Sequence, residues 1–281
     1  MPPLNPPLVA AERPVPSHGP DFAATFAQLR LTGRQTDHRP HRAITPLRIT
    51  PYLVAQAIVL PVALCALLAW HRHDLFDLWR DIILFWSREL GVPLVRAPLE
   101  GRLGSDGMAL SAGAYDRPLP SLPGMAVAAA AVVGLLWASL RMRNDSLPLK
   151  YPMRIVGVVQ GFALAYFWFV PQQFPYTISR HSEELMFIGY VMMIATPVML
   201  AAGYYLLNES LWAKVANTVA ILAFFTLFIP HQVMAQAWIM HHLSVLYMPV
   251  LYICFGAVFD ALVFVALYSW AMSDVSPHAT R

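Results

Sequence analysis

The chain has 281 residues, of which 58% are hydrophobic and only 12% are charged, and its formal net charge is +3. Soluble domains contain about 45–50% apolar and about 25% charged residues. This composition therefore excludes a disordered chain, a nucleic-acid-binding domain and an ordinary cytosolic enzyme. It predicts an all-α integral membrane protein. The two cysteines, Cys65 and Cys254, lie inside apolar runs, which disfavours a disulfide or a paired-cysteine metal site.

Residues 1–51 are predicted to form a Pro/Arg-rich cytoplasmic tail. This segment contains ten of the 24 prolines and six arginines. Proline at this density prevents a continuous helix or strand. Residues 21–29 have apolar side chains at helical spacing behind an aspartate that can cap a helix, so they form either a docking helix or a transient helix in a disordered tail. The first apolar run begins near Tyr52, too late for a signal peptide.

Six apolar segments are long enough to cross a membrane, for which a helix needs about 20 residues. The first predicted span, 52–70, is followed by an extracytoplasmic segment, 71–123. A transmembrane block of five helices then occupies 124–272, and 273–281 form a cytoplasmic C-terminus. The predicted helices of this block are 124–140, 153–170, 185–206, 212–230 and 247–272.

The distribution of Lys and Arg among the loops predicts the orientation. The tail is rich in arginine, and the loop 141–154 carries four basic residues against one acid, so both are expected in the cytoplasm. The loop 171–184 carries one arginine against two glutamates and the loop 231–246 has no Lys or Arg, so both are expected outside. Both termini of the chain should then be cytoplasmic. This is the layout of a multi-pass membrane protein.

The segment 71–123 is predicted to begin with an amphipathic helix over 74–86. Phe76, Trp79, Ile83 and Trp86 share one face of this helix, and three aspartates share another. Such a helix either lies on the membrane surface or continues the first span and packs on its neighbours. A Ser-Asp-Gly turn at 105–107 predicts a small β-hairpin. About 50 residues are too few for an independent domain, so we expect the helix and the hairpin to cap the helical bundle.

The predicted topology gathers six of the ten histidines on the outer side: His71, His73, His181, His231, His241 and His242. If 231–242 is helical, His231 and His242 share a face, about three turns apart. We take His231, His241 and His242, with Glu183 and Glu184, as candidates for a catalytic acid/base pair. The three histidines are also candidate ligands of zinc or copper. The alternative is that they only line the polar rim of the membrane. No other cofactor is expected.

Polar residues within the spans form a second candidate site. Asp260 lies midway along the last span, where an unsupported aspartate costs about 2.5–3.5 kcal/mol. We expect it to face the bundle interior, with Gln160 and Asn217 as candidate partners. It either has a functional role or fixes helix packing as a hydrogen-bonded acid. Gly157 and Gly161 form a GxxxG pattern, which lets a second helix approach closely.

Three short stretches resemble the small membrane proteins that are encoded beside bacterial exosortases. They are Tyr115–Gly124 (YDRPLPSLPG), Arg154–Gln160 (RIVGVVQ) and Leu246–Tyr252 (LYMPVLY), and together they cover less than a tenth of the chain. The order of one span, an extracytoplasmic segment and a block of spans is also similar. An exosortase itself needs a catalytic Cys with Arg and His, and Cys254 lacks the expected neighbouring motif. The resemblance thus implies a partner of the peptidase.

Three functions fit these observations. The sequence contains no P-loop, HExxH, GxSxG or paired CxxC motif, and no clear internal repeat. The first interpretation is a non-catalytic subunit of a cell-envelope sorting, secretion or biosynthesis assembly, with membrane lipids and other membrane proteins as partners and no nucleic acid. The second is a membrane-embedded transferase or hydrolase with an outer-face His/Glu site. The third is a small transporter or channel that uses Asp260.

Overall fold

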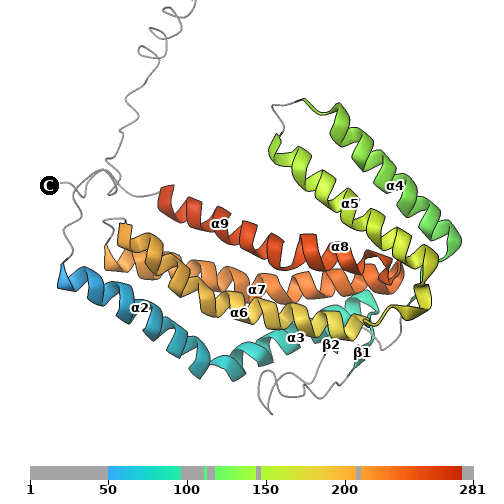
Figure 1. Ribbon diagram of the computed structural model, residues 1–281. Helices are drawn as coiled ribbons and strands as arrows, with labels where there is room; N and C mark the ends of the chain where they lie inside the picture. Colours follow the sequence, from blue (N-terminus) through green and yellow to red (C-terminus); the bar gives the residue numbers. More distant parts are fainter. Residues whose placement is uncertain (1–49, 96–110, 113–117, 144–146, 207–209, 274–281) are drawn as a thin grey trace, which may run out of the picture. The chain divides into compact units, whose positions relative to one another are not determined.

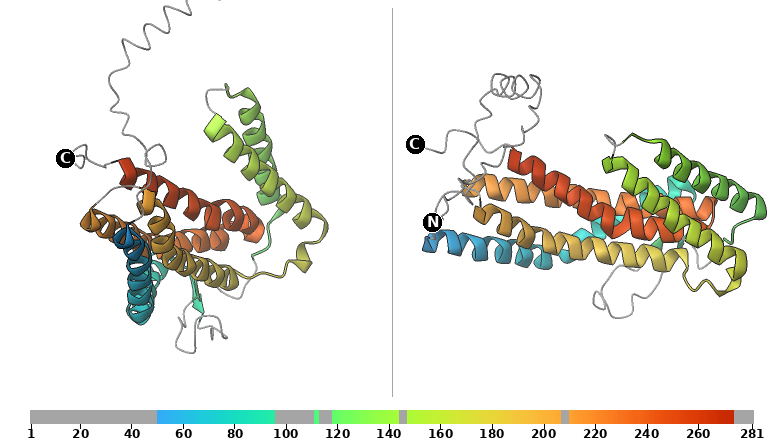
Figure 2. Two further views of the ribbon diagram at one scale, coloured as in Figure 1. Left: turned by 60° about the vertical axis from the view of Figure 1, so that its left-hand side comes forward. Right: turned by 45° about the horizontal axis from the view of Figure 1, so that its top comes forward.

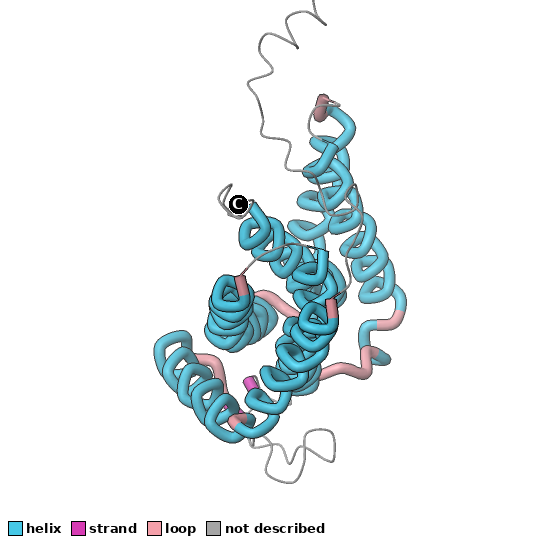
Figure 3. The backbone as a smooth tube through the Cα atoms, turned by 90° about the vertical axis from the view of Figure 1, so that its left-hand side faces the viewer, coloured by secondary structure: helices cyan, strands magenta, loops and turns pink. Residues whose placement is uncertain are grey.

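The computed structural model describes residues 50–95, 111–112, 118–143, 147–206 and 210–273, which are mostly helical (Figures 1 and 3). The chain divides into Met1–Pro46 and Leu47–Arg281, and all described residues belong to the second unit. The predicted tail helix at 21–29, the predicted turn at 105–107 and residues 274–281 lie outside the described residues.

Among the described residues, six helical segments are long and apolar enough to cross a membrane, which fits a multi-pass membrane protein. Five are the single helices α2 (Pro51–Trp70), α4 (Leu122–Arg141), α5 (Leu147–Phe169), α6 (Ile178–Leu206) and α7 (Leu211–His242). The sixth combines α8 (Met248–Tyr252), the π-helical turn η4 (Ile253–Ala257) and α9 (Val258–Ser273). The 3₁₀ turns η2 (Pro171–Gln173) and η3 (Val245–Tyr247) precede α6 and α8.

Hydroxyl side chains fix the start of three spans. Thr50, Ser121 and Ser210 accept hydrogen bonds from backbone N–H groups in the first turns of α2, α4 and α7, at 3.2–3.3 Å. These N–H groups have no partner within the helix, and a hydroxyl N-cap supplies one. Proline follows within the first two positions of α2 and α4, where its missing N–H costs nothing.

The fourth and fifth helices are longer than the sequence predicts. α6 begins at Ile178 and not at 185, and α7 continues past Pro230 to His242. The predicted outer loops 171–184 and 231–246 are therefore partly helical. At 1.5 Å per residue α7 is about 48 Å long, compared with about 30 Å for the hydrocarbon core of a bilayer. The extra turns lie beyond the purely apolar run and carry polar side chains. The backbone of these residues is still hydrogen-bonded within the helix.

The amphipathic helix predicted over 74–86 lies within α3 (Arg72–Leu90). In Figure 1, α2 and α3 follow one another along α6 and α7. Trp79 and Ile83 are fully buried, and the indole N–H of Trp79 donates to the carbonyl oxygen of Thr226 in α7 at 2.8 Å. The ring of Phe76 lies 5.2 Å from that of Tyr190 in α6. The sequence allowed this helix either to lie on the membrane surface or to pack on its neighbours. In the structure it packs on its neighbours.

Two strands of two residues each follow α3. β1 (Leu94–Val95) pairs antiparallel with β2 (Ser111–Ala112), with Leu94 opposite Ala112. The intervening residues 96–110 lie outside the described part of the chain. Two residue pairs do not establish the predicted hairpin, and the small cap that we expected from it is not supported.

α4 and α5 pack against one another as a helical hairpin (Figure 2). A Cβ atom at Gly157 would lie 2.7 Å from Cδ2 of Leu136, so this glycine permits the close approach of α5 to α4. A Cβ atom at Gly161 would lie 3.9 Å from Val132, an ordinary contact. The hairpin also contacts η3, where the Gln160 amide donates to the carbonyl oxygen of Leu246 at 3.2 Å.

Candidate functional site

A break in the last span is the centre of a buried polar network. Gly256, in η4, has φ −101° and ψ −124°, outside the helical region. Within a bilayer, a backbone carbonyl released by such a break needs a partner from the protein. The carbonyl oxygen of Phe255 has two: the side-chain amides of Gln232 and Gln236 donate to it at 2.6 Å and 2.7 Å. Because these glutamines are four residues apart on α7, they share one face and reach the same acceptor.

His181 joins this network from α6. Its Nε2 lies 2.8 Å from Oε1 of Gln236, and the side chain is only 4% exposed. The direction of each bond follows from the carbonyl of Phe255, which only accepts. Gln236 must therefore donate to it through Nε2, which leaves Oε1 to accept from N–H at Nε2 of His181. In the neutral imidazole, Nδ1 is then the nitrogen with the free lone pair.

A pocket of about 460 Å³ lies beside His181. Its walls come from the segment before α6, the first two turns of α6, and α8 with the start of η4. The lining residues are Phe174, Tyr176, Arg180, His181, Glu184, Met248, Pro249, Tyr252 and Ile253. The Arg180 guanidinium lies 2.7 Å from Glu184 and 4.0 Å from Glu183. The pocket thus combines one histidine and an ion-pair cluster with three aromatic rings.

Asp260 lies in α9, one turn beyond the break, and is only 1% exposed. Neither of its carboxyl oxygens has a hydrogen-bond partner among the described residues, and neither does Oε1 of Gln232. An ionised carboxylate only accepts hydrogen bonds, whereas a protonated one also donates. A proton on Asp260 would therefore supply a donor where the described residues supply none.

The predicted catalytic and metal-binding residues occupy separate places. His231 is exposed on α7, with its ring centroid 5.8 Å from that of Trp86, and its Nδ1–H donates to the carbonyl oxygen of Leu227 at 2.6 Å. His241 and His242 are adjacent, with ring centroids 5.1 Å apart. Because α7 is continuous, His231 and His242 share a face but are about 16 Å apart along the axis. The structure does not bring these three histidines together.

The other predicted residues are also distributed over the bundle. Glu184 lines the pocket with His181, and Glu183 lies next to Arg180. Gln160 is hydrogen-bonded to Leu246 in η3, and Asn217 is half-buried in α7. Because neither oxygen of Asp260 has a hydrogen-bond partner among the described residues, neither Gln160 nor Asn217 is one. No group of three His, Cys, Asp or Glu side chains suited to a metal ion occurs within the described ranges.

Sequence reasoning missed Gln232 and Gln236, and it noted His181 without selecting it. The signal for the glutamines is their spacing of four residues, which places them on one helix face. That signal requires α7 to continue beyond 230, where the predicted span ended. The pairing of His181 with Gln236 joins residues 55 positions apart, so no local pattern indicates it.

Comparisons with protein families, with curated proteins and with solved structures find no match to this chain. The chemistry of the site therefore has to be argued from its residues. Nδ1 of His181 can accept a hydrogen bond or a proton, Glu184 supplies a carboxylate, and Arg180 supplies N–H donors. The three aromatic rings can contact an apolar or a cationic group. This arrangement suits the binding of a small polar group at the end of a span.

Proposed function

We propose that the protein is a non-catalytic accessory subunit of a cell-envelope sorting, secretion or biosynthesis assembly. It is a multi-pass protein of the bacterial inner membrane, with both termini in the cytoplasm and residues 71–123 outside. The distribution of basic residues among the short loops supports this orientation. The resemblance to proteins encoded beside exosortases supports a sorting assembly in particular.

The main support for the proposal is that one face of α3 is buried in the protein while the other face is exposed. Its apolar face is buried against α6 and α7, with Trp79 and Ile83 fully enclosed. An amphipathic helix that anchors to a membrane directs its apolar face to the lipid. Since that face of α3 is already covered by the protein, its other face is the one left to contact a partner.

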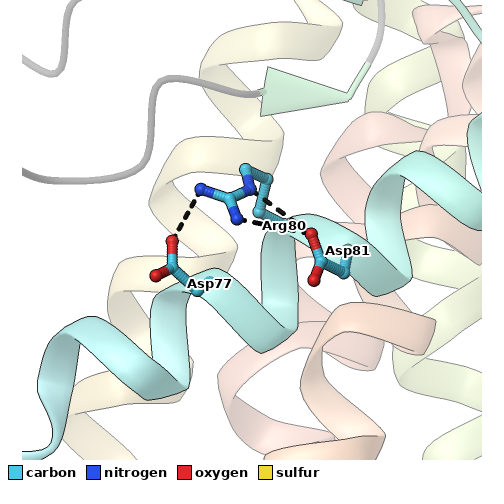
Figure 4. Close-up of polar contacts among 3 residues, drawn as sticks. All are labelled: Asp77, Arg80 and Asp81. Atoms are coloured by element: carbon cyan, nitrogen blue, oxygen red, sulfur yellow. Dashed lines mark hydrogen bonds and ion pairs between the residues drawn. The ribbon is translucent and has the colours of Figure 1, made fainter.

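The outward face of α3, defined here as Asp77, Leu78, Asp81, Phe85 and Arg88, mixes charged and apolar side chains. Leu78 and Phe85 are 41% and 56% exposed. Arg80 lies between the two aspartates, 2.6 Å from Asp77 and 3.4 Å from Asp81, which orders the charges of the face (Figure 4). Exposed aromatic and aliphatic groups within a polar rim are typical of a protein–protein interface.

Co-purification tests this proposal. Tagged full-length protein is purified from membranes of its own host in mild detergent, and the proteins that accompany it are identified and quantified. We expect at least one membrane protein in a fixed ratio. The double variant Asp77→Lys, Asp81→Lys should lose it without any loss of folded protein. The control Asp145→Lys, in the loop expected on the cytoplasmic side, should retain it. A wild-type protein that purifies alone, or an α3 variant that keeps its partner, would contradict the proposal.

A membrane-embedded transferase or hydrolase is the second candidate, favoured by the placement of His181 and Glu184 in one pocket. In that function Nδ1 of His181 would act as the general base. The variant His181→Gln separates the two functions, because a glutamine amide can replace the Nε2–H donor to Gln236 but not the base. In cells that lack the native gene, an enzyme would lose function in this variant while its partner still co-purifies. A non-catalytic subunit would retain function whenever the complex forms.

A further inference from the structure

We propose that the connected ends of α4 and α5 bind the phosphate of an anionic phospholipid such as phosphatidylglycerol. The first reason is the charge of this part of the chain. Residues 141–154, which run from the end of α4 into α5, contain four basic residues and a single acid, Asp145. Even if that acid pairs with one of them, three positive charges remain. A segment of this kind attracts anionic headgroups at a membrane surface.

The second reason is that three of these cations are held by neutral groups. Arg141, Lys150 and Arg154 form what we call the basic cluster. The guanidinium carbon of Arg141 lies 5.1 Å from the ring centroid of Trp137, and Nζ of Lys150 donates to the carbonyl oxygen of Met142 at 3.3 Å. Within the described part of the chain, no carboxylate forms an ion pair with any member of the cluster. Their charge is therefore left to attract an anion.

The third reason is that Arg154 is anchored across the hairpin with its donors still available. Its Nε–H donates to Oγ of Ser139, in α4, at 3.3 Å. Ser139 is only 1% exposed, and its hydroxyl donates to the carbonyl oxygen of Leu136 at 2.7 Å, which fixes Oγ as the acceptor. This contact uses one of the five guanidinium N–H groups, so both terminal nitrogens keep theirs. Two guanidinium nitrogens can bind two oxygens of one phosphate.

The other two cations also keep hydrogen-bond donors. Lys150 uses one of its three N–H groups on Met142, which leaves two for a ligand. The contact of Arg141 with Trp137 is made by the charge over the ring, so none of its N–H groups is spent on an acceptor. The cluster thus presents several donors and positive charge together, which suits the oxygens of a phosphate.

The position of the cluster selects a lipid as the source of the phosphate. It lies at the end of α4 and in the first eight residues of α5, and both helices are candidate spans. Residues at the end of a span lie at the level of the lipid headgroups. Trp137, Leu140 and Tyr151 are exposed beside the cluster and can contact the start of an acyl chain. α4 packs mainly on α5, which leaves its other side open to lipid (Figure 1).

Native mass spectrometry of the full-length protein in detergent tests this site. The protein is titrated with phosphatidylglycerol and phosphatidylcholine that carry the same acyl chains. Phosphatidylglycerol should bind at least tenfold more tightly, and added salt should reduce the difference because it screens charges near the surface. Excess inorganic phosphate should displace the lipid only partly, since it lacks the acyl chains. Equal binding of the two lipids would overturn the proposal, and complete displacement by inorganic phosphate would overturn the lipid as the source.

Substitutions assign the binding to the basic cluster. Arg141→Gln and Arg154→Gln should each weaken phosphatidylglycerol binding about fivefold, as expected for one basic residue near an anionic lipid. Arg154→Lys retains the charge and should lose less. Arg72→Gln, which removes an exposed cation from α3, is the matched control and should bind like the wild type.

Arg141 is exposed, so the Arg141→Gln variant tests the site even if Arg154→Gln does not fold. Wild-type binding in the Arg141→Gln variant, or an equal loss in the Arg72→Gln variant, would overturn the proposal. The result is independent of whether a protein partner co-purifies.

Discussion

Asp260 and Gln232 both have buried side-chain oxygens that lack a donor among the described residues. The amide N–H of Gln232 is used by the carbonyl oxygen of Phe255, and Oε1 of Gln232 and both oxygens of Asp260 have no partner among the described residues. A proton on Asp260 resolves this arrangement. We infer that the carboxyl is protonated, so that it carries a hydrogen-bond donor and no charge inside the bundle. This gives the residue a structural role that does not require transport.

Two substitutions at Asp260 test that role. Asp260→Asn keeps the shape and supplies a permanent donor, so its melting temperature in detergent should stay within a few degrees of the wild-type value. Asp260→Leu leaves Oε1 of Gln232 without a donor and should lower the free energy of unfolding by about 1–3 kcal/mol. Two equally stable variants would contradict the pairing. A well-folded but inactive Asp260→Asn protein would instead indicate that the proton moves during function.

At the scale of elements, Gly189 sets the distance between α6 and α7. A Cβ atom at this position would lie 2.6–3.0 Å from side-chain carbons of Ile229, which is only 1% exposed. Gly189→Ala should therefore destabilise the protein by about 1–3 kcal/mol through overpacking. Gly134 in α4 has no atom within 4 Å of the equivalent Cβ position, so Gly134→Ala is the matched control.

In the control, alanine should be neutral or should stabilise the helix by about 0.5–1 kcal/mol, because glycine is the weaker helix former. Thermal unfolding of both purified variants measures the difference. If Gly189→Ala is as stable as Gly134→Ala, then α6 and α7 do not approach as closely as described.

The attachment of α3 depends on Trp79. This side chain is fully buried and its N–H is bonded to Thr226. Trp79→Ala removes both the packing and the hydrogen bond and should cost about 3–5 kcal/mol. Amide hydrogen exchange should then increase across α3, where local opening becomes easier. Phe85→Ala, at an exposed position of the same helix, should leave exchange unchanged. Equal exchange in the two variants would show that α3 is held by other contacts.

Elements governed by local pattern were predictable from the sequence. The apolar runs of α2 and α4 coincide with the predicted spans within two residues at each end, because length and hydropathy alone define a helix that can cross a bilayer. The buried face of α3 also follows from helical periodicity. The predicted spans of α6 and α7 were too short because these helices also contain polar residues. His181 and Gln236 lie within them and are hydrogen-bonded to each other.

The site depends on contacts between distant parts of the chain and was predictable only in part. Glu184 was among the predicted residues, but it lies in a pocket with Tyr252 and Phe174 and away from His231. The residues that meet at the first turns of α6 come partly from the last span. Their positions depend on how that span breaks at Gly256. No sequence pattern specifies that break, since a glycine in a membrane helix is more often a packing residue.

At the scale of the whole molecule, the topology is open to direct measurement. In a background with Cys65→Ala and Cys254→Ala, single cysteines are introduced by Ser105→Cys and Ser146→Cys. A membrane-impermeant maleimide should label the first in intact spheroplasts and the second only after permeabilisation, because the basic loop 141–154 is expected in the cytoplasm. Labelling of the Ser146→Cys protein in intact spheroplasts would reverse the orientation.

The most direct test of the central claim is site-specific photo-crosslinking in intact cells of the native host. A photoreactive amino acid is placed at Phe85, on the outward face of α3, and in a second protein at Val62, an exposed residue of α2. A subunit that docks through α3 should give a discrete crosslinked protein from Phe85, and this product should disappear in the Asp77→Lys, Asp81→Lys variant. From Val62 only lipid adducts are expected. A Phe85 probe that gives no protein adduct, or the same adducts as Val62, would contradict the account.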